Sequence, residues 1–577
     1  MKVNRKFLRS AERLSLSAIA KDSAAQKIVS AVTAIGFVMQ PVAALASTIT
    51  RADAPNTNLA NGPVTNIFAE NVVGNVAINK FAEFKLDANN IANMYFGKSE
   101  TSNNAGNLVN FVDSRIDING TVNAIQNQKI GGNLFFFSSD GMAVGKTGVI
   151  NAGALYVATP TKTAFDDYKK LDTEDKFNTI IKDEGFAQIP INASGTISVL
   201  GKVNAVNAVN LRAAKIGVGK NVSENAIGDV AAGATATGAS ISTGVVVNFK
   251  DLVNIQNKDA NVNAGLTGDL KATKAKDASG DIVLAAYNNY NDNYSVKDDF
   301  KNIVGESVNA EVTIAQDAEV KATGNAKLSA QALNNVVVEK SDQYKENYTP
   351  STTTNSHLYG QIVTTNATVN VDGTVEATQV DITADAVNRY VSAESSVLNA
   401  SNITSNIVGA LTGNLDASYA VLNSKAEVNV GQSAVINATD SDTVSEGKVV
   451  KPALNIKANS SVEAGAGAST ALLKVMNVAG TNIIPAAAVT YSETHNEAAV
   501  NIDGTLKSTG GASVTALADS KVNSEAKATT MDVSENPNLG DVALNITTGD
   551  NKSSVTIGKT AQMTELQKDV NGRGKHR

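Results

Sequence analysis

The sequence predicts an all-β protein built as a right-handed parallel β-helix, a solenoid of stacked strands. Two observations lead to this prediction. Short strands with alternating apolar residues recur along the 577 residues, and the apolar content of 42% comes mainly from Ala, Val, Ile and Leu, with only 5% aromatic residues and no Trp. Small and β-branched residues suit stacked strands. An antiparallel sandwich or barrel is the alternative, although such folds usually have a stronger aromatic core.

The repeats in the C-terminal half carry the prediction. Five segments share a β-branched pair at alternate positions, and they begin 57, 59, 72 and 55 positions apart, at Val312, Val369, Val428, Val500 and Val555. A turn and two further short strands follow each pair, so the Asp-Gly turns do not signal simple hairpins. Each strand should send every second side chain inward, and stacked rungs of about 20 residues should bury them together.

The N-terminus is typical of an extended signal peptide. Residues 1–27 carry seven Lys and Arg against Glu12 and Asp22, and the uncharged run Ile28–Val38 and the small-residue series Ala43–Ala46 follow. The alternative is a membrane anchor, but 11 apolar residues are too few for a span of about 20. We expect cleavage between Ala46 and Ser47. No stable membrane span is expected later, because Val230–Phe249 is mostly small or polar.

The composition argues against catalytic, metal-binding and nucleic-acid-binding functions. The chain has no Cys, its three His residues are far apart in sequence, and its net charge of −7 gives no basic stripe for nucleic acid. The paired carboxylates Asp166-Asp167 and Asp172 with Glu174-Asp175 lie among lysines and are expected to form a solvated face. No catalytic motif or calcium repeat occurs. We therefore expect no enzyme activity, no cofactor and no metal.

Two segments depart from the strand pattern. Residues 162–190 space their apolar side chains as in a helix and predict a helical insert outside the β-helix, with a solvated loop as the alternative. The stretch Tyr287–Phe300 is rich in Asn, Asp and Tyr and predicts a protruding loop.

Four segments between Asn61 and Thr161 resemble, in order, the secretion domain of the filamentous haemagglutinin family of large exoproteins, and most closely that of leukotoxin-type filamentous adhesins. They are Asn79–Phe81 with Phe84, Asn107–Asn110 with the strand Arg115–Val122, Gly132–Met142, and Val144–Leu155 with Ala158-Thr159. The third resembles the family's A-N-L-F-L-I-N-P-N-G-I. Here Ser138-Ser139-Asp140-Gly141-Met142 replaces N-P-N-G-I, and only the Gly and the apolar end remain.

The resemblance implies two-partner secretion. The chain would cross the outer membrane unfolded through a dedicated transporter and fold outside into a rod that binds a host-cell receptor. The secretion-motif residues implied are Asn133, Ser138, Ser139, Asp140, Gly141 and Met142. The expected location is extracellular, at the cell surface, and the expected role is adhesion. The alternatives are a leukotoxin-like cytotoxin and, with less support, a β-helical enzyme that degrades polysaccharides.

The predicted organisation follows from these segments: a signal peptide (1–46), a secretion domain (47–161), a helical insert (162–190), β-helix repeats (191–300), repeats with modules of about 55–72 residues (301–565) and a basic tail (566–577). A repeat array normally ends in a polar cap. Because no such segment follows Met563, we expect a longer exoprotein.

Overall fold

The computed structural model describes residues 47–244, 279–293, 303–338, 355–392, 414–440, 444–445, 448–449, 452–474, 487–532 and 542–565. The predicted signal peptide (1–46) and the predicted basic tail (566–577) lie outside these ranges. Beyond its first strands, the described chain is a parallel β-helix, as predicted: 31 strands belong to one sheet, and nearly all pairings in it are parallel. The exceptions are β1 (Thr48–Arg51) and β3 (Asn71–Val73), which pair antiparallel with β4 (Val76–Leu86), and β9 (Lys129–Ile130), which pairs antiparallel with β8 (Thr121–Gln126).

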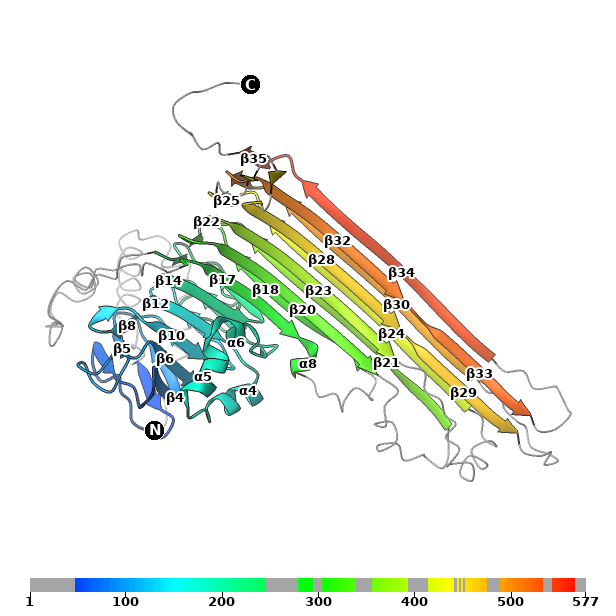
Figure 1. The fold of residues 1–577 in the computed structure, drawn as a ribbon, viewed down its shortest axis with the longest axis horizontal. Helices are drawn as coiled ribbons and strands as arrows, with labels where there is room; N and C mark the ends of the chain where they lie inside the picture. Colours follow the sequence, from blue (N-terminus) through cyan, green and yellow to red (C-terminus); the bar gives the residue numbers. More distant parts are fainter. Residues whose placement is uncertain are drawn as a thin grey trace, which may run out of the picture. The chain divides into compact units, whose positions relative to one another are not determined.

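The strands form three columns, and each strand pairs with the equivalent strand of the next rung (Figure 1). The first column holds β4, β6 (Asn107–Val112), β10 (Asn133–Phe137), β12 (Val149–Ala158), β14 (Lys202–Ala213), β17 (Ile282–Asn289), β20 (Ala326–Val338), β23 (Val380–Ser392), β28 (Leu454–Gly465) and β32 (Ala512–Val522). The second column holds the end of β4, β7 (Ile116–Ile118), β11 (Met142–Val144), β13 (Thr196–Val199), β15 (Lys215–Val218), β18 (Ile303–Ile314), β21 (Asn355–Val371), β24 (Asn414–Val430), β30 (Ala487–Ile502) and β34 (Val542–Ile557).

The third column consists of short strands, together with the first residues of β12 and β14. Its own members are β2 (Val64–Ile67), β5 (Ile91–Tyr95), β8 (Thr121–Gln126), β16 (Ser240–Ser242), β19 (Glu319–Lys321), β22 (Thr374–Ala377), β25 (Val435–Ala438), β31 (Thr505–Ser508) and β35 (Gln562–Glu565). Outside the columns lie β9 (Lys129–Ile130), the antiparallel pair β26 (Val444–Ser445) and β27 (Lys448–Val449), and the parallel pair β29 (Gly467–Lys474) and β33 (Glu525–Asp532).

Each repeat module of the C-terminal half is a single rung. Val312 pairs with Val369, Val369 with Val428, Val428 with Val500 and Val500 with Val555, so the predicted spacing is the length of one coil. The expected length of about 20 residues per rung is right between Ile197 and Ile216, which pair in successive rungs. It is wrong for the rungs of the C-terminal half, because the strands of the first two columns lengthen there to as many as 17 residues. The Asp372-Gly373 turn joins β21 to β22, which do not pair with each other as a hairpin would.

The interior changes character along these long strands. Near the third column it is aliphatic, with fully buried columns such as Val312, Val369 and Val428. Farther along the strands, Thr365, Asn388 and Ser424 are also buried. Asn388 donates from Nδ2 to the backbone oxygens of Val363 (2.9 Å) and Asn423 (2.8 Å), so it joins the first and second columns. These polar side chains remain buried because they are hydrogen-bonded.

Asparagine ladders also join successive rungs. In the third column, Asn93, Asn123, Asn151 and Asn204 each donate from Nδ2 to the Oδ1 of the asparagine one rung earlier, over 2.9–3.1 Å, and the ladder starts at Asn66. A shift of register by one residue would break every one of these bonds and turn the core side chains outward. The ladder therefore fixes the register.

The helical insert is confirmed and covers a second core on the outer side of the first column. It contains α4 (Lys162–Tyr168), α5 (Glu174–Ile181) and α6 (Asp183–Ala187), with Thr161 and Thr173 as N-caps of the first two. This core is aromatic, and its fully buried rings are Phe111, Phe135, Phe137, Phe165, Phe177 and Phe186. The predicted solvated face is present, since Asp166, Asp167 and Asp172 pair with Lys162, Lys170 and Lys176.

The loop predicted at Tyr287–Phe300 is wrong for its first half. Tyr287 lies in β17, whose buried and half-buried residues alternate, and Tyr290–Asn293 forms α8; residues 294–300 lie outside the described ranges. The Tyr287 ring lies 4.3 Å from the guanidinium carbon of Arg212, which is 8% exposed and donates from Nε to the backbone oxygen of Ile189. These contacts hold the stretch in the fold.

The last described rung has an open edge. Val555 and Ile557 of β34 are 45% and 58% exposed, whereas their partners Val500 and Ile502 in β30 are fully buried. Within the described ranges no strand pairs with the other edge of β34. No helix in the described residues is long and apolar enough to cross a membrane.

Candidate recognition surface

The segment that resembles the secretion motif forms one continuous part of a rung. Asn133–Phe137 is β10, Ser138–Gly141 is a turn, and Met142 begins β11. Parallel strands flank both: β10 lies between β6 and β12, and β11 lies between β7 and β13. The structure therefore brings the six predicted residues together. Ala46 lies outside the described residues, and Ser47 directly precedes β1.

Most of the six predicted motif residues contact neighbouring rungs or the core. Met142 is 1% exposed and points into the aliphatic core, and Asn133 donates from Nδ2 to Asn107 Oδ1 over 2.9 Å. Ser138 donates from Oγ to the backbone oxygen of Ser114 (2.7 Å) and accepts from the Asp140 backbone N–H (3.2 Å). The backbone oxygen of Ser139 accepts from Asn192 Nδ2 (3.0 Å). These contacts hold the turn against the neighbouring rungs.

Gly141 is required by the geometry of the turn. Its φ of +97° is rarely adopted by other residues, and a Cβ atom there would lie 2.1 Å from the backbone oxygen of Thr196 on the next rung. The turn geometry therefore explains why a Gly is found at this position of the motif.

Asp140 is the exposed residue of the turn, and it lines a cavity of about 540 Å³ that we call the charged groove. The groove is formed by the end of β4, the start of β7, residues 193–196, Lys215 and the loop segment 222–225. Seven of its lining residues are charged: the basic Lys85, Arg115 and Lys215 and the acidic Glu83, Asp117, Asp140 and Glu224. Charges of both signs therefore face one hollow.

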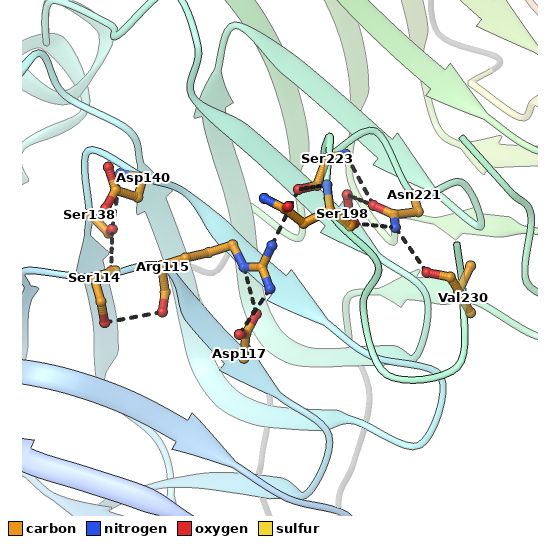
Figure 2. A network of polar contacts seen from close by, with 10 residues as sticks. Ser114, Arg115, Asp117, Ser138, Asp140, Ser198, Asn221, Ser223 and Val230 are labelled. Atoms are coloured by element: carbon orange, nitrogen blue, oxygen red, sulfur yellow. Dashed lines mark hydrogen bonds and ion pairs between the residues drawn. The ribbon is translucent and has the colours of Figure 1, made fainter. Parts of the chain in front are cut away.

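Arg115 joins two walls of the groove (Figure 2). Its Nε and Nη2 atoms donate to Asp117 Oδ1 (2.8 Å) and Oδ2 (3.0 Å), and its Nη1 donates to Ser223 Oγ (3.3 Å), 108 positions later. The bidentate pair holds the guanidinium in one orientation.

The loop that carries Ser223 is held by Asn221, which is fully buried (Figure 2). Asn221 donates from Nδ2 to the backbone oxygens of Asn225, Val230 and Ala231 over 2.9–3.1 Å and accepts at Oδ1 from the Ser223 N–H (3.0 Å). Apolar residues of the same loop, Ile227, Val230 and Ala236, pack on Ala143 and Leu200. The groove wall is thus preorganised.

Five charges of the groove have no close partner in the described part of the chain, although Lys85 is attracted at longer range by Asp87. Glu83, Lys85, Asp140, Lys215 and Glu224 form no ion pair and no side-chain hydrogen bond there, in contrast to Arg115 and Asp117. The sequence pattern identified Asp140 and the strand of Arg115. It missed Lys215 and Glu224, because only the pairing of β13 with β15 and the folding of the loop bring them to the motif.

A second polar cluster lies on the outer surface of β30 and β34. Glu493 accepts from Tyr491 Oη (2.5 Å) and contacts His495 Nε2 (2.9 Å), while His495 Nδ1 contacts Asp550. The hydrogen bonds that His495 makes to the carboxylates of Asp550 and Glu493 raise the pKa of His495 above its usual value, and the hydrogen bonds that Glu493 accepts from Tyr491 and His495 lower the pKa of Glu493. Within the described residues no group of three or more His, Asp or Glu side chains could hold a metal.

Among solved structures, the chain is similar to the crystal structure of the HMW1 secretion domain from Haemophilus influenzae. The identity is 14%, the match covers 86% of this chain and 96% of that chain, and the TM-score is 0.20. No family model matches the chain, and no curated protein matches it.

Proposed function

We propose that this chain is a secreted surface exoprotein, exported by a two-partner system, and that its β-helix mediates adhesion to host cells by binding rather than by catalysis. The observation that carries the export proposal is the placement of the secretion-like motif. Asn133–Met142 forms one strand and one turn, with its buried members fixed by neighbouring rungs and Asp140 left exposed at the charged groove.

The way the fold is built is compatible with export of an unfolded chain. In each of the three columns a strand pairs with the strand of the preceding rung, so folding can start at the N-terminal rungs and propagate as more chain emerges. The sequence has no Cys, so no disulfide can form before passage.

The outer face of the second column supports the adhesion proposal. Tyr419 of β24, Tyr491 of β30 and Ile546 of β34 occupy one column of partners, and Ile546 is 42% exposed. Tyr is enriched in protein recognition surfaces because its ring is apolar and its hydroxyl polar. The adjacent Glu493, His495 and Asp550 add polar contacts.

Binding of the purified chain to host cells tests the adhesion proposal. We expect saturable binding that falls when Tyr419→Ser and Tyr491→Ser are combined and that persists in the control Lys327→Ser, an exposed residue of β20. Unchanged binding of the double variant would rule out this face.

The same purified chain also tests the two alternative functions, a cytotoxin and a polysaccharide-degrading enzyme. Lysis of leukocytes without stable adhesion would favour the cytotoxin, and release of sugar products from polysaccharide would favour the enzyme. Deletion of the transporter gene in the producing bacterium tests the export half of the proposal.

A further inference from the structure

We propose that the open end of the last described rung is a docking site for a partner protein, which adds one further rung through a strand, a two-residue corner ending in Gly and a second, shorter strand. The open end consists of β32, β34 and β35, none of which pairs with a following strand in the described part of the chain. Docking there depends on the stacking of rungs and on neither export nor adhesion.

Core positions are exposed in the columns of the open end. Val555 and Ile557 of β34 and Met563 of β35 are 45%, 58% and 52% exposed, whereas their partners one rung earlier are at most 2% exposed. Val514 of β32 is only partly buried. An unpaired strand edge with exposed apolar side chains is a template for another strand. The stacking that buries the earlier rungs is thus continuous with this surface.

The corners between the second and third columns show which kind of rung fits. Among the described rungs, a corner of four residues is followed on the next rung by a corner of two in all four cases. These pairs are 87–90 and 119–120, 145–148 and 200–201, 315–318 and 372–373, and 431–434 and 503–504. The last described corner, 558–561, has four residues. The docking segment should therefore have a corner of two.

Glycine is required at the second position of each two-residue corner. A Cβ atom at Gly504 would lie 2.5 Å and 2.8 Å from the backbone oxygens of Gly431 and Ala434, the first and last residues of the corner beneath it. At the other three short corners the equivalent distances are 2.2–2.6 Å, and the glycines are Gly120, Gly201 and Gly373. A larger residue would clash at each of them. Because Gly558 and Ala561 are the first and last residues of the last corner, they impose the same requirement.

Backbone hydrogen bonds surround each of these glycines. The residue before the Gly donates its N–H to the last residue of the preceding second-column strand, as Asp503 does to Val430 (2.8 Å). The residue after the Gly donates to the last residue of the four-residue corner, over 2.8–2.9 Å in all four cases. At the open end, Ile557 and Ala561 hold the equivalent carbonyls. The docking segment would bind them through the same two N–H groups.

Neither the tail of the chain nor a second copy fits this end. Residues 566–577 number 12, while the coil from Val500 to Val555 takes 55 residues. At the N-terminal end of a second copy, β1 and β3 already pair with the outer edge of β4. The open end of a second copy has a corner of four residues and not of two. A partner protein with a segment that forms a rung is the occupant that fits.

Two peptides taken from this chain test the selectivity of the open end on the purified full chain. The first, residues 489–508, contains the two-residue corner Asp503-Gly504, and the matched control, residues 417–438, is its equivalent in register with the four-residue corner 431–434. We expect the first peptide to bind saturably and to slow hydrogen exchange of the β34 amides. The control, and the first peptide with Gly504→Val, should bind about tenfold more weakly or not at all.

Substitutions in the chain locate the site. Ile557→Lys places a charge at a core position of the new rung and should abolish binding of the first peptide. Thr556→Lys, at the exposed neighbouring position that faces outward, should leave binding unchanged. Both side chains are exposed, so neither change should disturb the folded chain.

Three results would overturn the proposal. The first is equal binding of the two peptides, or binding of neither. The second is dimerisation of the chain alone with protection of the β34 amides, which would assign the open end to a second copy. The third is a product from the producing bacterium that continues beyond Arg577 with residues that protect β34, which would assign the end to the chain itself.

Discussion

Val428 of β24 lies directly opposite Val500 of β30 although 72 residues separate them, the longest interval in the repeat. Both side chains are fully buried. The intervening chain includes the whole of β25 and β28, and the register of the column is unchanged by this length. Register is therefore set by the stacked side chains and not by the length of the connecting segments.

The asparagine ladder of the third column predicts a large effect for a buried member. Asn123→Ala removes the bonds to Asn93 and Asn151 and leaves buried amide groups of both neighbours unpaired. We expect a loss of about 1–3 kcal/mol in the free energy of unfolding, measured by urea denaturation. Asn66→Ala at the exposed end of the ladder is the control and should cost less. Equal losses would show that burial of the ladder does not matter.

The turn of the secretion-like motif predicts strain on substitution of its glycine. Gly141→Ala combines an unfavourable φ with a clash against the Thr196 backbone, and we expect a loss of about 2 kcal/mol or more in unfolding free energy. Gly238→Ala is the control, because Gly238 has a φ of +77° but nothing within 4 Å of the added Cβ. If both variants lose the same stability, close packing at the motif turn contributes nothing.

The helical insert predicts the limits of a stable N-terminal fragment. A fragment of residues 47–161 would expose Phe135 and Phe137, which α4–α6 cover. It would also lack β13 and β14, the partners of β11 and β12. Exposure of each Phe costs about 1.5–3 kcal/mol. We expect cooperative urea unfolding, followed by circular dichroism, for residues 47–244 and not for 47–161. Equal midpoints would contradict this role of the insert.

The cluster on β30 and β34 predicts a pH-dependent stability. The raised pKa of His495 means that its contribution is fully present below about pH 6.5 and is lost as the pH rises through the raised value. The lowered pKa of Glu493 means that its contribution is fully present above its usual pKa near 4.5 and is lost as the pH falls through the lowered value.

His495→Gln should therefore destabilise β34 by about 0.2–1 kcal/mol near pH 5.5 and have almost no effect at pH 9. Hydrogen exchange of the β34 amides, corrected for intrinsic rates, measures this difference. A constant difference across this range would exclude titration of His495 as the cause.

The column of valines shows what the sequence could predict and where prediction stopped. The five β-branched pairs beginning at Val312 marked the stacked strands of the second column correctly. The rung length was wrong because the inward positions continue as Thr365, Ser424 and Thr494, which hydropathy does not distinguish from surface residues. Hydropathy does not mark the inward position of Asn388 either. Asn388 can be buried because it donates to backbone oxygens on another column.

The groove was predictable only in part. The motif resemblance led to Asp140 and to the strand of Arg115, which lie at the groove. Lys215 and the loop with Ser223 and Glu224 carry no local signal, since their place depends on stacking and on the Asn221 hydrogen bonds. The aromatic core under the insert was also unforeseen, because outward-facing residues of the first column were expected to meet water.

Export of the full chain tests the central claim most directly. The chain is expressed in the producing bacterium with the transporter gene intact, deleted or restored, and the cell surface, medium and periplasm are assayed together with the N-terminal residue of the product. The account predicts a mature chain beginning at Ser47, outside the cell only when the transporter is present, and retained in the periplasm or degraded without it. Equal amounts outside the cell in all three strains would contradict two-partner secretion.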